Sequence, residues 1–412
     1  MKWVIQHIKQ LVNTRTNSIV VRGAELSQLP IIDHAFLVIE NGIIQAYGSM
    51  HELTTEHTSG AEWIDAAGST VLPCWCDSHT HLVFAASREE EFVHKINGLS
   101  YAEIAAKGGG ILNSAQKIAL ASEDELYEQA MARLHHLMKL GTGAIEIKSG
   151  YGLNIANELK MLRVIKRIKE TAPIPVKSSF LGAHTYPLDF KENHEGYIKQ
   201  IIEEMLPVIA QEKLADYIDV FCEDGFFSVT ETKRICEAGK GYGLKPKIHA
   251  NQLHASGGVE LGVQIGAVSV DHLETMNDAA IQALSKSTTI GTMLPTAAFF
   301  LRMPYQPARA LIQANAALAI ASDYNPGSSP SGNMNFVVTL SCIQMKMLPE
   351  EAINAATING AFALELESEM GSITKGKRAN LIFTKPIPSL AFLPFAFGSN
   401  LIDRVMVSGT FL

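Results

Sequence analysis

The chain of 412 residues is longer than one hydrophobic core usually organises, which predicts one large domain and one smaller domain. Its hydrophobic content of 47% and charged content of 18% are ordinary for a globular protein, and its net charge of -8 argues against a general nucleic-acid partner. No apolar run reaches the ~20 residues that a membrane-spanning helix needs, so no membrane association is expected.

The N-terminal residues 1–5 lack the apolar core and the small-residue cleavage site of a signal peptide. The five cysteines are an odd number and are widely scattered along the chain. Both features are typical of reduced thiols in a cytoplasmic protein.

Short strands are predicted near both ends of the chain. Asn41-Gly42 is a typical two-residue turn between the strands of a hairpin. The candidate segments are residues 18–26, the hairpin 35–48, and residues 371–383 and 401–409. Neither end supplies enough strands for a domain of its own. We therefore expect residues 1–70 and 367–412 to combine into one composite β-sandwich domain, with the rest of the chain inserted between them.

Between residues 71 and 366, short apolar runs alternate with segments of helical periodicity. The predicted strands are residues 71–77, 142–147, 176–181, 217–222, 246–250, 267–271, 289–294 and 318–322. The clearest helices are residues 126–140, 156–169, 197–209 and 308–317, and Gly141 is placed to end the first of them. Eight such units predict a (β/α)₈ TIM barrel as the catalytic domain. The rival, a doubly wound open sheet, usually carries a glycine-rich phosphate turn after its first strand, and this chain has none.

Polar residues recur at the ends of the predicted strands, where barrel enzymes carry their chemistry. His79 and His81 follow the first strand, and residues i and i+2 of an extended segment point the same way, so both imidazoles can bind one ion. The further residues at strand ends are His184, His249, His272 and Asp323. Together they predict a metal site at the carboxyl end of the barrel.

These residues and their surroundings resemble the imidazolonepropionase family of the metal-dependent amidohydrolase superfamily. The most specific stretches are Glu-Ile-Lys-Ser-Gly-Tyr-Gly-Leu at residues 146–153 and Asn-Pro-Gly-Ser-Ser-Pro at residues 325–330. The resemblance extends from about residue 18 to the C-terminus. It implies hydrolysis of the cyclic amide C–N bond of 4-imidazolone-5-propanoate to N-formimidoyl-L-glutamate in histidine degradation. It also implies one zinc or iron ion per chain and a homodimer.

Carried over by position, the metal ligands of the family are His79, His81, His249 and Asp323. Such a set leaves one coordination position open for water and lowers the pKa of that water toward ~7, which gives hydroxide at neutral pH. Asp323 is expected to accept the water's proton, and His272 to orient the hydroxide or polarise the ring carbonyl. Gln252 contributes by hydrogen bonding, because an amide cannot act as a base.

The resemblance also implies the residues that hold the substrate. They are Arg88, Tyr101, Tyr151, His184, Gln252, Asn325, Gly327 and Ser328. Arg88 suits the propanoate because a guanidinium binds a carboxylate through two parallel hydrogen bonds. Tyr101 lies near Arg88 in the sequence and is expected to help hold the carboxylate.

Three alternatives stay open. In other superfamily members a carboxylated lysine or a glutamate bridges two metal ions, and Lys148 and Glu223 are the candidates here, although we expect a single ion. A nucleobase deaminase or another cyclic amidohydrolase with the same metal set would not explain Arg88 together with the loop at residues 148–152. A non-catalytic scaffold would be expected to have lost ligands, and this chain retains all four.

Overall fold

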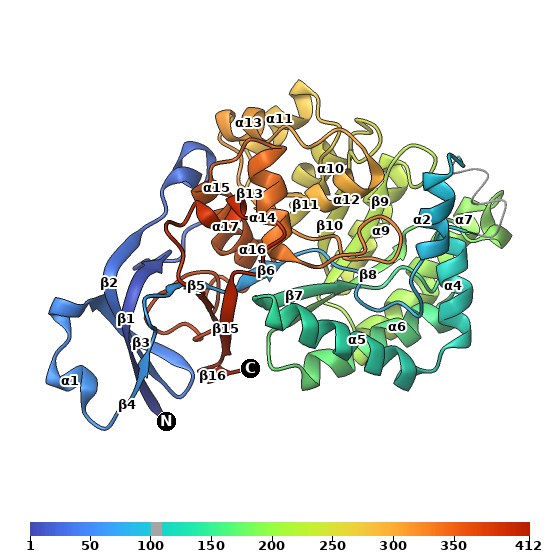
Figure 1. Cartoon of the computed structure of the whole chain (residues 1–412). Helices are drawn as coiled ribbons and strands as arrows, with labels where there is room; N and C mark the ends of the chain where they lie inside the picture. Colours follow the sequence, from blue (N-terminus) through green and yellow to red (C-terminus); the bar gives the residue numbers. More distant parts are fainter. Residues whose placement is uncertain (100–108) are drawn as a thin grey trace.

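The computed structural model describes residues 1–99 and 109–412. Two sheets organise these residues: an eight-stranded sheet built from both ends of the chain, and an eight-stranded parallel sheet formed by the middle. In Figure 1 the terminal sheet lies to the left of the barrel, and both termini lie at its lower end. The predicted fold class, a (β/α)₈ barrel with a small composite β-sandwich formed by the two terminal segments, is confirmed in its architecture, and the terminal strands form one mixed sheet.

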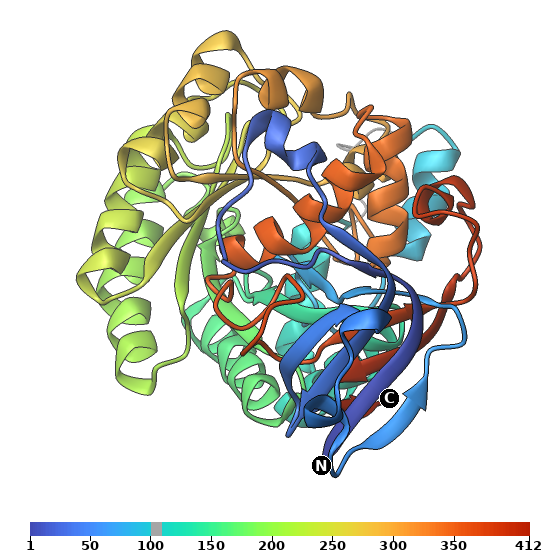
Figure 2. The same ribbon diagram turned by 90° about the vertical axis from the view of Figure 1, so that its left-hand side faces the viewer.

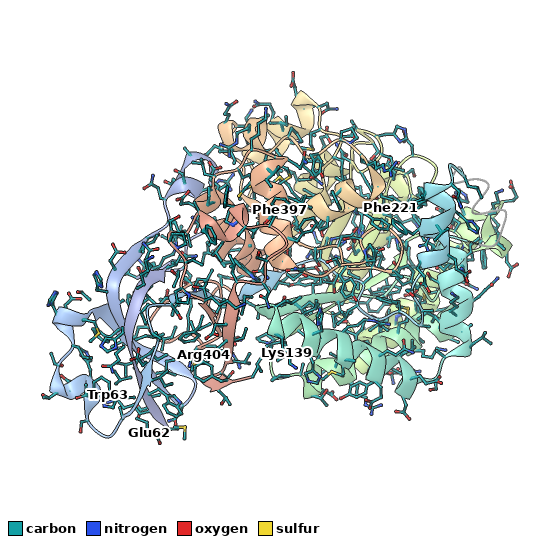
Figure 3. The ribbon with its side chains drawn as sticks, viewed as in Figure 1. Glu62, Trp63, Lys139, Phe221, Phe397 and Arg404 are labelled. Carbon is teal, nitrogen blue, oxygen red and sulfur yellow. The ribbon has the colours of Figure 1, made fainter. Side chains whose placement is uncertain are left out.

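The terminal sheet follows the order β16-β15-β14-β5-β1-β2-β3, with β4 paired to β1. Its strands are β1 (Lys2–Val12), β2 (Ile31–Glu40), β3 (Ile43–Ser49), β4 (Glu62–Asp65), β5 (Thr70–Pro73), β14 (Leu381–Thr384), β15 (Ile402–Val407) and β16 (Thr410–Phe411). Ile5, Leu37, Phe383 and Met406 share one buried cluster, so strands from both ends of the chain pack around a common core. The exposed Trp63 of β4 lies at its outer edge, far from Phe221 of the barrel (Figure 3).

The predicted hairpin is β2 and β3, and Asn41 and Gly42 both have the positive φ that its two-residue turn requires. The predicted strand at residues 18–26 is wrong, because Gly23–Ser27 forms a 3-10 helix, η1. Before this helix, the backbone of Val21 exchanges hydrogen bonds of 2.9 and 2.8 Å with the side-chain amide of Asn359. The segment is therefore held by a barrel side chain and by one isolated antiparallel bridge, Arg22 to Ala317, rather than by a continuous strand pairing.

β1 has no counterpart among the predicted strands, although it pairs with three others. Its apolar alternation is interrupted between Ile5 and Ile8, where the register shifts and His7 has a φ of 54°. A bulge of this kind breaks the period of two that identifies a strand in a sequence.

The barrel strands run parallel in chain order from β6 to β13. They are β6 (Trp75–Asp77), β7 (Thr142–Lys148), β8 (Val176–Ala183), β9 (Tyr217–Cys222), β10 (Lys245–Ala250), β11 (Ser269–His272), β12 (Ile290–Met293) and β13 (Leu318–Ile320). The predicted first strand, residues 71–77, is divided between the two sheets. The N–H of Cys74 donates to Asn380 O (3.0 Å), whereas that of Trp75 donates to Gly141 O (2.9 Å), so the chain changes sheets between these residues. The predicted domain limits at residues 70 and 367 stay a prediction.

The barrel closes at its carboxyl end through the residues that follow β6 and β13. Asp323 N–H donates to His79 O (3.0 Å), and His81 N–H donates to Tyr324 O (2.8 Å). The Asp77 carboxylate accepts from the backbone N–H and the hydroxyl of Ser322, at 3.0 and 2.6 Å. Three candidate ligands thus lie directly on the seam that holds the barrel shut.

Helices surround the barrel strands (Figure 2). They are α2 (Glu89–Ile96), α4 (Ile111–Leu120), α5 (Glu123–Lys139), α6 (Ile155–Thr171), α7 (His194–Lys199), α8 (Leu206–Glu212), α9 (Val229–Gly241), α10 (Gly258–Gln264), α11 (Asp278–Ser285), α12 (Pro295–Leu301), α13 (Ala308–Gln313), α14 (Met334–Ile343), α15 (Pro349–Ala356) and α16 (Ile358–Ala363). The predicted helix at residues 197–209 is α7 and α8 joined by a π-helical turn, Gln200–Met205. Gly141, with a φ of 96°, follows α5 as predicted. Short helices α1 (Thr55–Thr58) and α17 (Phe392–Phe395) accompany the terminal strands. In the described part of the chain, no helix has the length and apolar character to cross a membrane.

Candidate metal centre and substrate cavity

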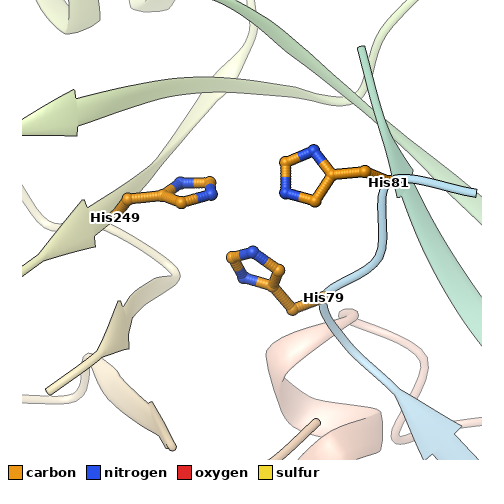
Figure 4. A group of neighbouring side chains, drawn as sticks. All are labelled: His79, His81 and His249. Carbon is orange, nitrogen blue, oxygen red and sulfur yellow. The ribbon is translucent and has the colours of Figure 1, made fainter. Parts of the chain in front are cut away.

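Three buried imidazoles meet at the carboxyl end of the barrel. His79 and His81 follow β6, and His249 is in β10. One nitrogen atom from each ring lies within 4.8 Å of the corresponding atom of the other two. Figure 4 shows the three rings pointing into one common space. The predicted convergence of these residues from distant parts of the sequence is therefore observed.

Carboxylates fix the orientation of two of these rings. His79 Nδ1 lies 2.7 Å from Asp271 Oδ2, and His249 Nδ1 lies 3.0 Å from Asp219 Oδ1. Because a carboxylate only accepts, each Nδ1 donates and each Nε2 keeps its lone pair. Both Nε2 atoms are buried without a hydrogen-bond partner among the described residues. Burial lowers the pKa of His79, His81 and His249, which keeps the rings neutral, as metal ligands must be.

Asp323 joins this cluster on the side of His79 and His81. Its Oδ1 lies 3.6 Å from the Nε2 atom of each ring, which is too far for a hydrogen bond. Two atoms that bind the same ion at ~2.0–2.2 Å can lie at most about 4.4 Å apart, so a spacing of 3.6 Å would allow both to bind one ion. Burial raises the pKa of Asp323 to about 7. Three imidazoles and one carboxylate are donors suited to zinc or iron.

His272, at the end of β11, lies beside the cluster. Its ring centre is 5.7 Å from that of His79 and 5.3 Å from that of His249, and its Nδ1 lies 3.3 Å from Glu274 Oε1. Burial alone would lower the pKa of His272, but Glu274 and Asp323 raise it above its usual value. This ring holds a proton more readily than the three clustered rings.

The two residues that would bridge a second metal ion both have other partners. Glu223 accepts hydrogen bonds from the backbone of Asp224 (2.9 Å) and Leu253 (2.8 Å). Lys148 donates to Glu146 and Asp219, both at 2.7 Å. The amine of Lys148 is therefore engaged in ion pairs, whereas Glu223 lies in a second group, with Asp224 and His254, whose ligand atoms are within 4.8 Å of one another.

A cavity of about 760 Å³ opens beside the imidazoles. Its lining includes most of the predicted site residues: His81, Arg88, Tyr151, His184, His249, Gln252, His272, Asp323, Asn325, Gly327 and Ser328. Tyr101 lies outside the described residues. An apolar part of the lining is not predicted from the sequence; it is formed by Phe92, Phe221, Phe226, Phe300 and Met303. Phe92 lies four residues after Arg88, a helical spacing that hints at a shared face, whereas the others carry no motif.

Arg88 is held at the cavity by two contacts. Its Nε and Nη2 atoms donate to the two oxygens of Glu91 at 2.9 and 2.5 Å, and Glu91 also accepts from Gly110 N–H (2.9 Å). On its other side the guanidinium lies against Gly327, where a Cβ atom would overlap Nη1. Gly327 thus contributes by having no side chain, which permits this close approach.

Two loops present the remaining polar residues. The Asn325 carbonyl accepts from the N–H groups of Gly327 (2.8 Å) and Ser328 (2.7 Å), and its amide donates to Asp323 O (2.6 Å). Asn325 therefore shapes its own loop. His184 Nδ1 donates to Gly150 O (3.0 Å), which leaves Nε2 as an acceptor. Burial and the neighbouring His249 lower the pKa of His184 to about 3.

The similarity of the chain to known proteins extends over nearly its whole length. The amidohydrolase family matches residues 70–412. A protein of Flavobacterium johnsoniae described as imidazolonepropionase is 57% identical over 407 residues, which cover 98% of both chains. A protein of Christiangramia forsetii with the same description is 54% identical and covers 99% of both chains. Escherichia coli guanine deaminase superposes with a TM-score of 0.74 at 13% identity and covers 100% of this chain and 99% of that chain, a likeness of fold alone.

Proposed function

The chain belongs to the amidohydrolase family and, within it, to the imidazolonepropionases, and we propose how its residues carry out that reaction. The substrate is 4-imidazolone-5-propanoate, whose cyclic amide C–N bond is hydrolysed to give N-formimidoyl-L-glutamate. The observation that carries the proposal is the convergence of three buried imidazoles, His79, His81 and His249, with the Asp323 carboxylate 3.6 Å from the first two.

We assign His79, His81, His249 and Asp323 as ligands of one zinc or iron ion. Such an ion supplies Lewis-acid chemistry, because it acidifies water and polarises a carbonyl oxygen. A single ion is supported by the ion pairs of Lys148 with Glu146 and Asp219, which keep this amine from bridging two ions.

The cavity residues orient the substrate. The Arg88 guanidinium, fixed by Glu91, binds the propanoate at the end of the cavity formed by Gly327 and Ser328. Tyr151, His184 and Gln252 hydrogen-bond the ring and hold its carbonyl carbon toward the metal ligands. Tyr101 is assigned to the carboxylate on sequence resemblance alone. Fixing both ends of the substrate lowers the entropic part of the barrier.

Two groups handle protons in this scheme. Asp323 accepts a proton from the attacking water, because its carboxylate lies beside His79 and His81 at the metal site. His272, with its raised pKa, donates a hydrogen bond to the oxyanion that develops at the ring carbonyl. When the C–N bond breaks, Asp323 delivers its proton to the leaving nitrogen.

The test uses purified full-length protein of known metal content and follows the loss of imidazolone absorbance. Removing the ion with a chelator should lower turnover at least ~1,000-fold, about 4 kcal/mol of barrier. Zinc or iron(II) should restore turnover, whereas magnesium, which prefers oxygen ligands, should not. Undiminished turnover by protein without metal would contradict the assignment.

We further propose that the chain acts as a homodimer in the cytoplasm. The compartment is supported by its five free cysteines, four of which are buried. The dimer is supported by the family resemblance, and sedimentation of the purified protein tests it. A monomeric mass at the concentration of the activity assay would contradict the dimer.

A further inference from the structure

A buried lysine lies at the end of β7, inside the barrel and close to the metal ligands. Lys148 is 0% exposed, and its Nζ atom donates to Glu146 Oε1 and Asp219 Oδ2, both at 2.7 Å. The same Nζ lies 3.6 Å from Asp271 Oδ2. One ammonium group therefore faces three carboxylates from three different strands.

Two of these carboxylates are the ones that orient metal-binding imidazoles. Asp219 accepts from His249 through Oδ1 and from Lys148 through Oδ2. Asp271 presents the same oxygen, Oδ2, to both His79 and Lys148. His79 and His249 come from distant parts of the sequence, yet their orienting carboxylates share this single cation.

The charge of Lys148 keeps this arrangement together. Burial alone would lower the pKa of Lys148, but Asp219, Glu146 and Asp271 raise it above the usual value of a lysine. A protonated amine has no lone pair to form a carbamate, so the carboxylated-lysine alternative is disfavoured. Without the ammonium, carboxylates packed at this spacing in a dry interior would repel each other and move apart.

We propose that Lys148 is a positioning residue that holds Asp219 and Asp271, and through them the His249 and His79 rings, in the geometry that binds the metal ion. The inference rests on the proposed metal site. Its direct consequence is a loss of metal affinity when the ammonium is removed, because groups that orient ligating histidines typically contribute 10–100-fold to affinity.

Lys247 of β10 provides a matched control. It is also 0% exposed, and its Nζ donates to Glu146 and to Ser78 O (2.9 Å). Its Nζ also lies 4.0 Å from Asp271 Oδ2, farther than the 3.6 Å of Lys148, and among the described residues it makes no hydrogen bond or ion pair with Asp219. Removing it deletes a buried cation from the same network but leaves both orienting carboxylates with Lys148.

The experiment measures zinc affinity of full-length Lys148→Met and Lys247→Met by competition with a chromogenic chelator, alongside their free energies of unfolding without metal. Lys148→Met should bind zinc at least ~10-fold more weakly than wild type, whereas the zinc affinity of Lys247→Met should stay within ~3-fold of wild type. The free energy of unfolding should fall in both variants, because each loses a buried cation. Equal losses of affinity, or none in Lys148→Met, would overturn the inference. A wild-type chain that does not bind zinc would instead overturn the proposed metal site.

Loss of folding in Lys148→Met is covered by a second pair of variants. Lys148→Met combined with Glu146→Gln removes one positive and one negative charge together, and Glu146→Gln alone is its reference. The double variant should again bind zinc at least ~10-fold more weakly than its reference. Equal affinity of the two proteins would overturn the inference.

Discussion

At the scale of single residues, the site depends on contacts that leave selected atoms free. The Nδ1 atoms of His79 and His249 donate hydrogen bonds to Asp271 and Asp219, and this orients both rings so that their Nε2 atoms face the common space. His184 is oriented in the same way, because Gly150 O accepts a hydrogen bond from its Nδ1 atom. In each case an acceptor outside the cavity selects the tautomer that is presented inside it.

The close contact between Gly327 and Arg88 predicts that a side chain at residue 327 would weaken substrate binding. Gly327→Ala adds a methyl group that overlaps Nη1 of Arg88, and because Arg88 is held by Glu91, the guanidinium must shift or lose that partner. The Michaelis constant should rise at least ~10-fold, about 1.4 kcal/mol, with zinc content unchanged. Steady-state kinetics with imidazolone absorbance measures it.

Gly241→Ala is the matched control, because a Cβ atom there meets nothing within 4 Å. It should leave the Michaelis constant unchanged. A Gly327→Ala enzyme with wild-type kinetics would show that the guanidinium does not depend on this close approach.

The residue types at strand ends indicate a metal site, and the family resemblance adds its ligand set and the polar half of the cavity lining. The spacing of His79 and His81 alone places two rings on one side of an extended segment. Asp219, Asp271 and Lys148 are different, because their roles depend on how neighbouring strands align, and β7, β9 and β11 are brought into register only by the closed barrel. The register between neighbouring strands produces no local sequence pattern, so these contacts cannot be predicted from the sequence.

At the scale of elements, one helix supports the loop that follows β7. The buried Glu158 of α6 accepts from the N–H groups of Gly150 (3.2 Å), Gly152 (2.7 Å) and Leu153 (3.1 Å). Gly150 O in turn holds His184, and Tyr151 lies between these contacts. The helix thereby fixes two substrate-facing residues without touching the cavity itself.

Replacing this carboxylate with its amide tests that role. Glu158→Gln puts an NH₂ group against a backbone N–H, which leaves a buried donor unsatisfied at a cost of about 1–3 kcal/mol. We expect a Michaelis constant raised at least ~5-fold with unchanged zinc affinity, since no metal ligand is involved. Glu170→Gln, at an exposed position of the same helix, should change neither value. A fall in zinc affinity with a normal Michaelis constant would contradict this role.

Helices and strands with an unbroken hydrophobic periodicity can be predicted from the sequence. Strands that contain a bulge, or that pass from one sheet to another, cannot. α5 and α6 match their predicted ranges closely, because their apolar spacing continues over four turns. β1 is interrupted by the bulge at His7, and residues 71–77 form one apolar run that the structure divides between two sheets. The hydropathy of a segment indicates only that it is buried. Because residues 71–77 are buried in both sheets, their hydropathy does not show where the chain passes from one sheet to the other.

At the scale of the whole molecule, the terminal sheet and the barrel meet around the base of β6. Cys76, Ala144, Leu364 and Met370 form one buried cluster there, which joins the first two barrel strands to the segment leading back to the terminal sheet. Lys377 spans this segment, because its Nζ donates to Met370 O (2.8 Å) and Ser372 Oγ (2.7 Å). A cation thus lies at the junction of the two units, far from the metal ligands in the sequence.

The cation at this junction predicts a pH dependence of stability. Burial lowers the pKa of Lys377 to about 8, below the ~10.4 of a lysine in the unfolded chain. Between these values the unfolded chain binds the proton that the folded chain has lost, so the contribution of Lys377 to the free energy of unfolding rises with pH, by at most about 1.4 kcal/mol per unit. The free energy of unfolding of wild type and of Lys377→Met is measured by urea unfolding between pH 7 and 10.5. Above pH 8, the free energy of unfolding of wild type should rise relative to that of Lys377→Met. A difference that stays constant over this range would mean that the folded junction keeps the proton as tightly as the open chain does.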